Sequence, residues 1–136
     1  MHIEFSEGLT DDARAIRTEV FIEEQGFKEE FDEIDGRSIH IVIYDGGVAA
    51  ATCRVFQEGG IFHIGRVAVR KPFRGHAYGA AIMDAAEQRV RAMGGTEIAV
   101  SAQVRAKGFY EKSGYEATGE EYPDEGCPHV KMIKKL

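Results

Sequence analysis

An apolar strand, a basic turn and an alanine-rich helix follow one another in Gly65-Arg66-Val67-Ala68-Val69-Arg70-Lys71-Pro72-Phe73-Arg74-Gly75-His76-Ala77-Tyr78-Gly79-Ala80-Ala81-Ile82-Met83. The first turn of a helix carries about four unpaired N–H groups and about half a positive charge, and both favour a phosphate placed there. Gly75 and Gly79 allow a ligand to approach the backbone, and Arg70, Lys71 and Arg74 add positive charge. The stretch therefore predicts a binding site for a diphosphate group.

The composition is that of a soluble globular protein. The chain has 136 residues, of which 43% are hydrophobic and 29% are charged, and this length predicts one domain over residues 1–136. No apolar run is long enough to span a membrane, and the first residues lack the pattern of a signal peptide. We therefore expect a cytoplasmic protein without a membrane partner.

Charge and cysteine content exclude further classes of protein. There are 17 basic and 23 acidic residues, and the net charge of -6 argues against nucleic acid as the main partner. Cys53 and Cys127 are far apart and have no metal-ligand spacing, so we expect neither a disulfide framework nor a metal site. Cys53 is predicted to be a small core residue of a strand, and Cys127 is predicted to lie in a loop.

The remaining pattern predicts a mixed α/β fold. Thr10 or Asp11 is expected to cap a first helix, Asp45-Gly46-Gly47 indicates a hairpin, and the acidic segment 23–35 is expected to be irregular. Further helices are predicted over residues 78–93 and 104–112. Strands are predicted over residues 3–5, 39–44, 48–56, 61–69, 97–102, 115–120 and 130–136.

Two motifs resemble those of a known family, the GNAT superfamily of N-acetyltransferases. The turn at 74–79 looks like the R/Q-x-x-G-x-G/A signature of that family, although Ala77 stands where many members have glycine. The segment 108–115, Gly-Phe-Tyr-Glu-Lys-Ser-Gly-Tyr, is similar to its F-Y-x-x-x-G-F segment. The segments 20–25, 35–36 and 128–132 resemble the branch of ElaA/YjcF-like proteins and glyphosate N-acetyltransferase. The likeness covers nearly the whole chain.

The resemblance implies a fold and a co-substrate. The expected fold is a mixed, mostly antiparallel sheet of six to seven strands with flanking helices and a V-shaped splay between the central strands. The expected co-substrate is acetyl-CoA, without a metal. The backbone of Val67, Ala68 and Val69 is expected to pair with pantetheine, and an N–H near Val67 is expected to stabilise the oxyanion of the thioester. The diphosphate is assigned to Arg74, Gly75, His76, Ala77, Tyr78, Gly79 and Ala80.

Two side chains are predicted to move protons during acetyl transfer. Freeing the lone pair of a lysine-like amine at pH 7 costs about 4–5 kcal/mol, so such an acceptor needs a base. The resemblance assigns this role to His129, and a free imidazole is mostly neutral near pH 7. Tyr110 matches the tyrosine of the family and is expected to donate a hydrogen bond or proton to the departing thiolate. Both positions also admit a structural role, in the core for Tyr110 and at a strand end for His129.

The acceptor is predicted only as a small-molecule primary amine. Arg66 matches a substrate-binding arginine of the glyphosate branch, but Gln103 stands where that branch has a second arginine, which argues against the herbicide. Arg66 favours an acceptor with a carboxylate or phosphonate, unless it pairs with one of the many carboxylates of the chain. The acidic run 29–33 is typical of a solvated face; if it borders the cleft, it favours a cationic acceptor. Both alternatives stay open at this point.

A second function and an assembly also follow from the pattern. A non-catalytic protein that binds acyl-CoA as a sensor or interaction module needs the turn at 74–79 but neither Tyr110 nor a base. His40 is predicted to be structural or to line the acceptor cleft. A strand at the C-terminus is expected to offer an edge for a homodimer.

Overall fold

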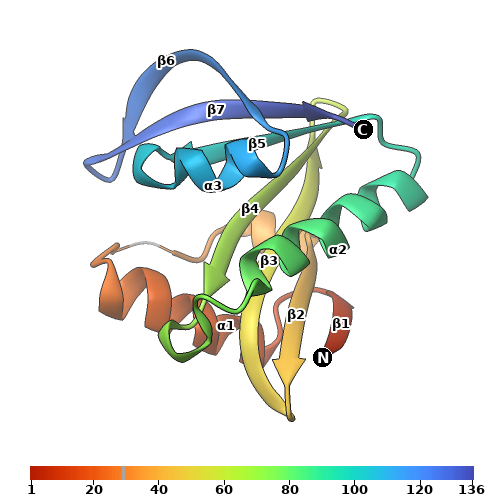
Figure 1. The fold of residues 1–136 in the computed structure, drawn as a ribbon, viewed down its shortest axis with the longest axis vertical. Helices are drawn as coiled ribbons and strands as arrows, with labels where there is room; N and C mark the ends of the chain where they lie inside the picture. The colour runs from red at the N-terminus through yellow and green to blue at the C-terminus, as the bar shows by residue number, and fades with distance from the viewer. Residues whose placement is uncertain (29) are drawn as a thin grey trace.

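A seven-stranded sheet in the order β1-β2-β3-β4-β5-β7-β6 organises the computed structural model, which describes residues 1–28 and 30–136 (Figure 1). The strands are β1 (His2–Glu7), β2 (Ile39–Asp45), β3 (Val48–Glu58), β4 (Ile61–Val69), β5 (Glu97–Gln103), β6 (Glu116–Asp124) and β7 (Cys127–Lys135). The α-helices are α1 (Asp11–Arg17), α2 (Tyr78–Ala92) and α3 (Lys107–Lys112). A π-helical segment (Thr18–Glu24) continues α1, and short 3-10 turns lie at Glu33–Arg37, Lys71–Phe73 and Val104–Ala106.

Near the centre of the sheet, β4 and β5 pair in parallel. This contact has three residue pairs, from Phe62 with Ile98 to Ile64 with Val100, and the two strands then diverge. Figure 1 shows β2 and β3 running nearly vertically and β4 slanting across them, while β5, β6 and β7 run across the top of the view. The mixed, mostly antiparallel sheet with flanking helices and a central splay is thus confirmed.

A β-bulge in β4 marks the point of divergence. Thr52 of β3 pairs with Ala68 and Arg54 pairs with Gly65, so Arg66 and Val67 together face the single residue Cys53. Arg66 has a φ of 53°, in the left-handed region that is unfavourable for a residue with a Cβ. The bulge bends β4 away from β5.

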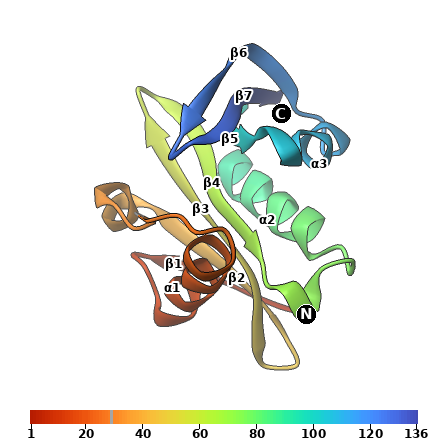
Figure 2. The ribbon, with the colours of Figure 1, turned by 90° about the vertical axis from the view of Figure 1, so that its left-hand side faces the viewer.

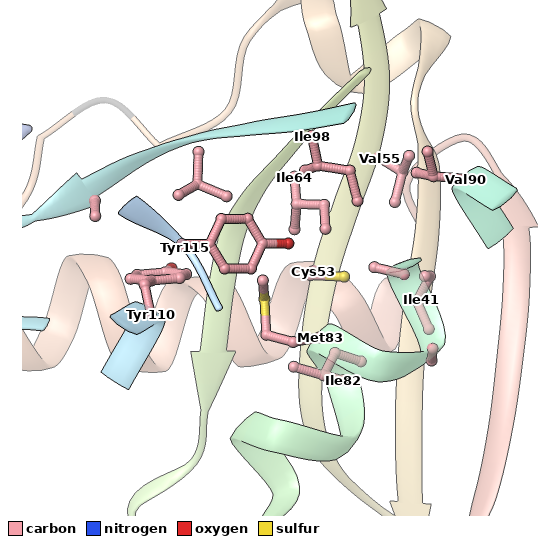
Figure 3. Close-up of a cluster of buried hydrophobic side chains, with 14 of the residues drawn as sticks. Ile41, Cys53, Val55, Ile64, Ile82, Met83, Val90, Ile98, Tyr110 and Tyr115 are labelled. Carbon is pink, nitrogen blue, oxygen red and sulfur yellow. The ribbon is translucent and has the colours of Figure 1, made fainter. Parts of the chain in front are cut away.

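The two faces of the sheet are covered by different helices (Figure 2). Helix α2 places Ile82, Met83 and Val90 against β-strand residues such as Ile41 and Ile64 in the larger core (Figure 3). Helix α1 covers the opposite face in a smaller core. Its residues in that core are Ala13 and Ile16, joined by Val20, Phe21, Val42 and Ala68. Thr10 caps α1 by accepting the Ala13 N–H over 3.2 Å.

The predicted elements are found with small shifts, and one prediction is wrong. The helix predicted over 104–112 consists of a 3-10 turn followed by α3, and the last two strands extend toward each other. Cys127 was predicted to lie in a loop but is the first residue of β7, because the turn at Glu125–Gly126 closes a longer hairpin. Cys53 is 1% exposed in β3, as predicted. No helix among the described residues is long and apolar enough to cross a membrane.

The turn before α2 uses left-handed backbone at two positions. Gly75 has a φ of 81°, which glycine adopts without strain, and Ala77 has a φ of 65°. Ala77 is the N-cap of α2, and no side chain caps this helix end within the described residues. The methyl group of Ala77 therefore strains the turn where glycine would fit.

We predict that Ala77→Gly raises the free energy of unfolding by about 0.5–1 kcal/mol, because glycine relieves the left-handed strain. The matched control, Ala80→Gly, makes the same change inside α2 and should lower that free energy by a similar amount. Urea denaturation measures both. A loss of stability in both variants would contradict strain at Ala77.

Candidate active site

Two cavities open where β4 and β5 diverge. The larger, here called the α2 groove, has a volume of about 1030 Å³ and lies between the end of β4, the start of α2 and helix α3. It is lined by Val20, Glu24, Gln25, Val67, Ala68, Val69, Phe73, Arg74, Gly75, Ala77, Tyr78, Gly79, Ala80, Arg105, Ala106, Phe109, Tyr110 and Lys112. All the residues assigned to the co-substrate line it except His76, whose side chain is exposed to solvent.

The α2 groove offers unpaired backbone groups along its length. The first intrahelical bond of α2 runs from the Ala81 N–H to the Ala77 carbonyl, so the N–H groups before Ala81 have no helical partner. Beyond Ile64, the side of β4 that faces β5 has no strand partner within the described residues. A helix N-terminus and an open strand edge thus border one groove, which fits a diphosphate joined to an amide-bearing arm.

The basic residues of the turn are used differently from the prediction. Arg74 lines the groove and forms an ion pair with Glu24 at 2.6 Å, and its Nε donates to the Val69 carbonyl at 2.9 Å. The hydrogen bonds that Arg74 Nη1 and Nη2 donate to the Glu24 carboxylate lower the pKa of Glu24. Arg70 instead pairs with Glu19 at 3.0 Å and does not line the groove, and neither does Lys71. The basic side chains that line the groove are therefore Arg74, Arg105 and Lys112 rather than Arg70 and Lys71.

Gly79 has a packing role that the sequence did not reveal. A Cβ built on Gly79 would lie 2.9 Å from Cε1 of Phe109, which is closer than real Cβ contacts allow. The glycine therefore lets α3 approach the first turn of α2. This approach closes one wall of the α2 groove, because Gly79 and Phe109 both line it.

The second cavity, here called the β4–β5 cleft, has a volume of about 380 Å³. It is lined by Phe21, Gln25, Phe27, Glu30, Phe31, Asp32, Ile64, Gly65, Arg66, Val67, Ser101, Gln103, Ala106, Tyr110, Asp124, Glu125 and His129. Gln25, Val67, Ala106 and Tyr110 also line the α2 groove. The two cavities therefore meet beside the bulge of β4.

Tyr110 stands at this junction. Its side chain is 9% exposed and packs edge-on against Phe109 and Tyr115, as part of the larger core (Figure 3). Burial raises the pKa of Tyr110, so the phenol keeps its proton. Its hydroxyl makes no hydrogen bond within residues 1–28 and 30–136 and is thus an unused donor.

His129 enters the cleft from β7. Its side chain is 7% exposed, and Nδ1 lies 2.8 Å from the carbonyl oxygen of Cys127. A carbonyl only accepts hydrogen bonds, so Nδ1 carries the proton and Nε2 has the free lone pair. The ring stacks on Tyr122 with centroids 6.0 Å apart, and the Tyr122 hydroxyl bonds to Ser101 Oγ.

Sequence reasoning missed Tyr122 and Ser101. The pairing register of the β6–β7 hairpin sets Tyr122 opposite His129. Counting outward from the Glu125–Gly126 turn would have found this pair, but the predicted strands ended before the turn.

Arg66 is held by carboxylates of the protein itself. Its Nε lies 3.0 Å from Glu30 Oε1, and its Nη2 lies 3.5 Å from Asp32 Oδ2. Its Nε also lies 3.2 Å from the Glu30 carbonyl. Arg66 lines the β4–β5 cleft, and its guanidinium contacts Glu30 and Asp32.

Behind Arg66 lies a buried network of charges that no sequence pattern indicated. Arg17, which is 1% exposed, contacts Glu30 at 3.0 Å and Asp35 at 2.7 Å. Arg54, which is 3% exposed, contacts Asp32 at 2.7 Å and Asp35 at 2.9 Å. Three arginines from α1, β3 and β4 thus neutralise three carboxylates of the segment 30–35.

The acidic run 29–33 is therefore only partly the solvated face that was predicted. Glu30 is 4% exposed, and Glu29 lies outside the described residues. Burial raises the pKa of Glu30 despite the nearby Arg66 and Arg17. Burial also acts to raise the pKa of Asp35, but hydrogen bonds from Arg17 and Arg54 overcome it and hold this pKa well below its ordinary range. Asp35 therefore stays ionised at neutral pH.

Gln103 and His40 are the remaining residues for which the sequence predicted a place in or near the acceptor cleft. Gln103 lines the cleft at the end of β5, where its Nε2 donates to Gln25 Oε1 at 2.9 Å. His40 is buried and does not line the cleft. Its Nε2 bonds to the Asp35 carbonyl at 3.0 Å, and burial lowers its pKa. His40 thus has the structural role among the two predicted for it.

Comparisons with known proteins agree on one family. Residues 8–136 match the description of an acetyltransferase (GNAT) domain. The uncharacterized N-acetyltransferase YjcF of Bacillus subtilis is 37% identical over 126 residues, which cover 90% of each chain. An acyl-CoA N-acyltransferase from Pseudomonas aeruginosa has a similar structure, with a TM-score of 0.86, 27% identity and 98% of both chains covered. ElaA of Escherichia coli shares the fold, with a TM-score of 0.83, 24% identity and coverage of 98% of this chain and 99% of ElaA.

We predict that Asp35→Asn lowers the free energy of unfolding at pH 7 by about 3–5 kcal/mol, because Arg17 and Arg54 lose a shared buried carboxylate. Urea denaturation measures this change. Asp84→Asn, at an exposed position of α2, is the matched control and should change stability by less than about 0.5 kcal/mol.

The difference in the free energy of unfolding between Asp35→Asn and the natural chain should depend on pH, and the pKa of Asp35 fixes the direction of this dependence. The pKa of Asp35 is lowered by folding, so its contribution is complete above the unfolded pKa of about 3.9 and is lost as the pH falls through the folded pKa. The two stabilities should therefore converge in acid. A difference that grows below about pH 4 would contradict the network.

Proposed function

Because the chain belongs to the GNAT family of acetyltransferases, we propose that it transfers the acetyl group of acetyl-CoA to a primary amine of a small molecule by direct attack on the thioester. One observation carries this proposal: the α2 groove and the β4–β5 cleft meet at Tyr110 and Val67. The junction gives a donor and an acceptor separate entrances and a common point of reaction.

The α2 groove is the proposed site of coenzyme A, which supplies the acetyl group as a thioester. The backbone N–H groups from Ala77 to Ala80 would bind the diphosphate at the positive end of α2. The open side of β4 at Val67, Ala68 and Val69 would bind the amide arm in the manner of an added strand. Gly75 and the pair Arg74–Glu24 shape the entrance.

The β4–β5 cleft is the proposed site of the amine. Its nitrogen forms a bond to the acetyl carbon while the bond from that carbon to sulfur breaks. His129 Nε2 accepts the proton that the nitrogen releases, since Nδ1 already donates to the Cys127 carbonyl. The Tyr110 hydroxyl donates a proton to the departing sulfur and is reprotonated from water. The products are the N-acetyl amine and free coenzyme A.

The cysteines do not support a covalent enzyme intermediate. Cys53 is buried in β3, and burial raises the pKa of its thiol. Cys127 begins β7 and lines neither cavity. A nucleophilic cysteine needs a lowered pKa and access to the donor, so direct attack by the amine is the consistent route.

The release of free thiol tests the proposed function against a non-catalytic acyl-CoA sensor. We expect the chain to bind acetyl-CoA saturably by calorimetry and to release free coenzyme A in the presence of a mixed panel of amines. Saturable binding without amine-dependent thiol release would favour the sensor. Absence of binding at millimolar acetyl-CoA would overturn both.

Tyr110→Phe is predicted to lower kcat by about 10- to 100-fold with little change in acetyl-CoA affinity, because the sulfur loses its proton donor. Steady-state kinetics and calorimetry measure the two quantities. Tyr115→Phe is the matched control: it also removes a buried hydroxyl, which bonds to Glu87 at 2.9 Å outside both cavities, and should retain turnover. If Tyr110→Phe retains turnover as well as Tyr115→Phe does, Tyr110 has no role in the reaction.

His129→Gln is predicted to lower kcat by about 100-fold near pH 7. The loss of kcat should become smaller as the pH approaches the pKa of the amine, about 10 for a lysine-like amine. The sign follows because an ammonium must first lose a proton before it can attack, whereas at high pH the amine is already neutral and solvent takes the proton released after the attack. A profile of kcat against pH measures the effect. His63→Gln, on β4 outside both cavities, is the control, and a defect in His129→Gln that is uniform over pH would assign His129 to structure.

A further inference from the structure

The charged side chains that line the β4–β5 cleft are mostly acidic. They are Glu30, Asp32, Arg66, Asp124 and Glu125. One wall of the cleft is formed by Arg66 with Glu30 and Asp32, and Arg17 and Arg54 lie behind it. The positive charges of Arg17, Arg54 and Arg66 balance the negative charges of Glu30, Asp32 and Asp35. The wall is therefore neutral as a whole, and the cleft has a net negative charge from its remaining side.

Arg66 is poorly suited to hold an acidic acceptor. Its guanidinium already has Glu30 at 3.0 Å and Asp32 at 3.5 Å, and Glu30 is buried in contact with Arg17. An incoming carboxylate would have to share Arg66 with two carboxylates that are fixed by other arginines. Repulsion between like charges in a partly desolvated cleft opposes this arrangement.

The negative charge of the cleft comes from the end of the β6–β7 hairpin. Asp124 is the last residue of β6, and Glu125 follows in the turn. The Asp124 carboxylate makes no hydrogen bond or ion pair within the described residues, whereas Glu125 accepts the backbone N–H of Lys28 at 3.2 Å.

Two polar side chains of the same cleft, the proposed proton donor and base, offer groups to a ligand. The side chains of Tyr110 and His129 are both more than nine-tenths buried, at 9% and 7% exposure, and both line the cavity. Within the described residues, neither the Tyr110 hydroxyl nor His129 Nε2 has a hydrogen-bond partner. Both groups line the cleft and are therefore available to a polar ligand that enters it.

We propose that the acceptor is a small dicationic amine, in which one nitrogen reacts beside His129 and Tyr110 while a second, charged nitrogen binds Asp124 and Glu125. This inference rests on the proposed function and specifies its substrate class. Asp124 pairs with Cys127, two residues before His129, which separates the two ends by about 7 Å along β7. A chain of about four carbons between the nitrogens suits this spacing.

Three amines of four carbons each test the charge preference. They are 1,4-diaminobutane, n-butylamine and 4-aminobutanoate, which carry an ammonium, a methyl group and a carboxylate at the far end. At low ionic strength we expect kcat/KM for the diamine to exceed that for butylamine by about 10-fold, and the amino acid to react more slowly than butylamine. Added salt should reduce these ratios.

Substitutions in the hairpin localise the effect. The double variant Asp124→Asn/Glu125→Gln should bring the diamine-to-butylamine ratio of kcat/KM close to one. The matched control, Glu120→Gln/Glu121→Gln, removes two exposed carboxylates of β6 that do not line the cleft and should preserve the ratio. An equal loss of the ratio in both double variants would overturn the assignment to Asp124 and Glu125.

Calorimetry in saturating coenzyme A measures acceptor binding apart from turnover. We expect the diamine to bind more tightly than the other two amines. Tighter binding or faster turnover of 4-aminobutanoate overturns the inference, as does failure of all three to bind, even if another amine is acetylated. Lack of acetyl-CoA binding is a different result, because it removes the proposed function itself.

Discussion

The separation of β4 from β5 is the constraint on which the rest of the structure depends. A parallel pair of strands would normally share an uninterrupted row of hydrogen bonds, but here the pairing ends at Ile64 and Val100. The bulge at Arg66 and Val67 bends β4 at the next step, at the cost of a left-handed residue that is not glycine. Both cavities open at this point, and Val67 lines both. The same defect in the sheet thus provides an open backbone edge and the space beside it.

A gap in the centre of a sheet must be supported from behind, and this protein does so with charge as well as with apolar side chains. The α2 side of the sheet has a conventional core, whereas the segment 30–35 is fixed by Arg17, Arg54 and Arg66. A buried ion pair adds little stability compared with apolar packing, but loss of one partner is costly. The network therefore fixes the position of an otherwise irregular segment, and it makes the wall of the cleft electrically neutral.

The chemistry of the site follows from these surroundings. Burial keeps the Tyr110 phenol protonated, and the carbonyl of Cys127 fixes the proton of His129 on Nδ1. Tyr110 thus offers a hydrogen-bond donor, and His129 Nε2 an acceptor, to the same cleft. Tyr110 comes from α3 and His129 from β7, and both line the β4–β5 cleft because the helix and the hairpin border the same opening.

The sequence alone determined the features that depend on neighbouring residues: the strand-turn-helix at 65–83, the order of elements, the cap of α1 and the family likeness carried by the turn at 74–79 and by Tyr110. Hydrophobic period and capping are local, so these predictions succeeded. Only the tertiary structure decided that Arg70 turns away from the groove, that Gly79 is required by Phe109, that Tyr122 stacks on His129 and that Arg66 faces Glu30. These contacts join residues from separate elements of the fold. Packing and strand register decide which side chain meets a given charge or ring, and neither of them appears as a periodic pattern in the sequence.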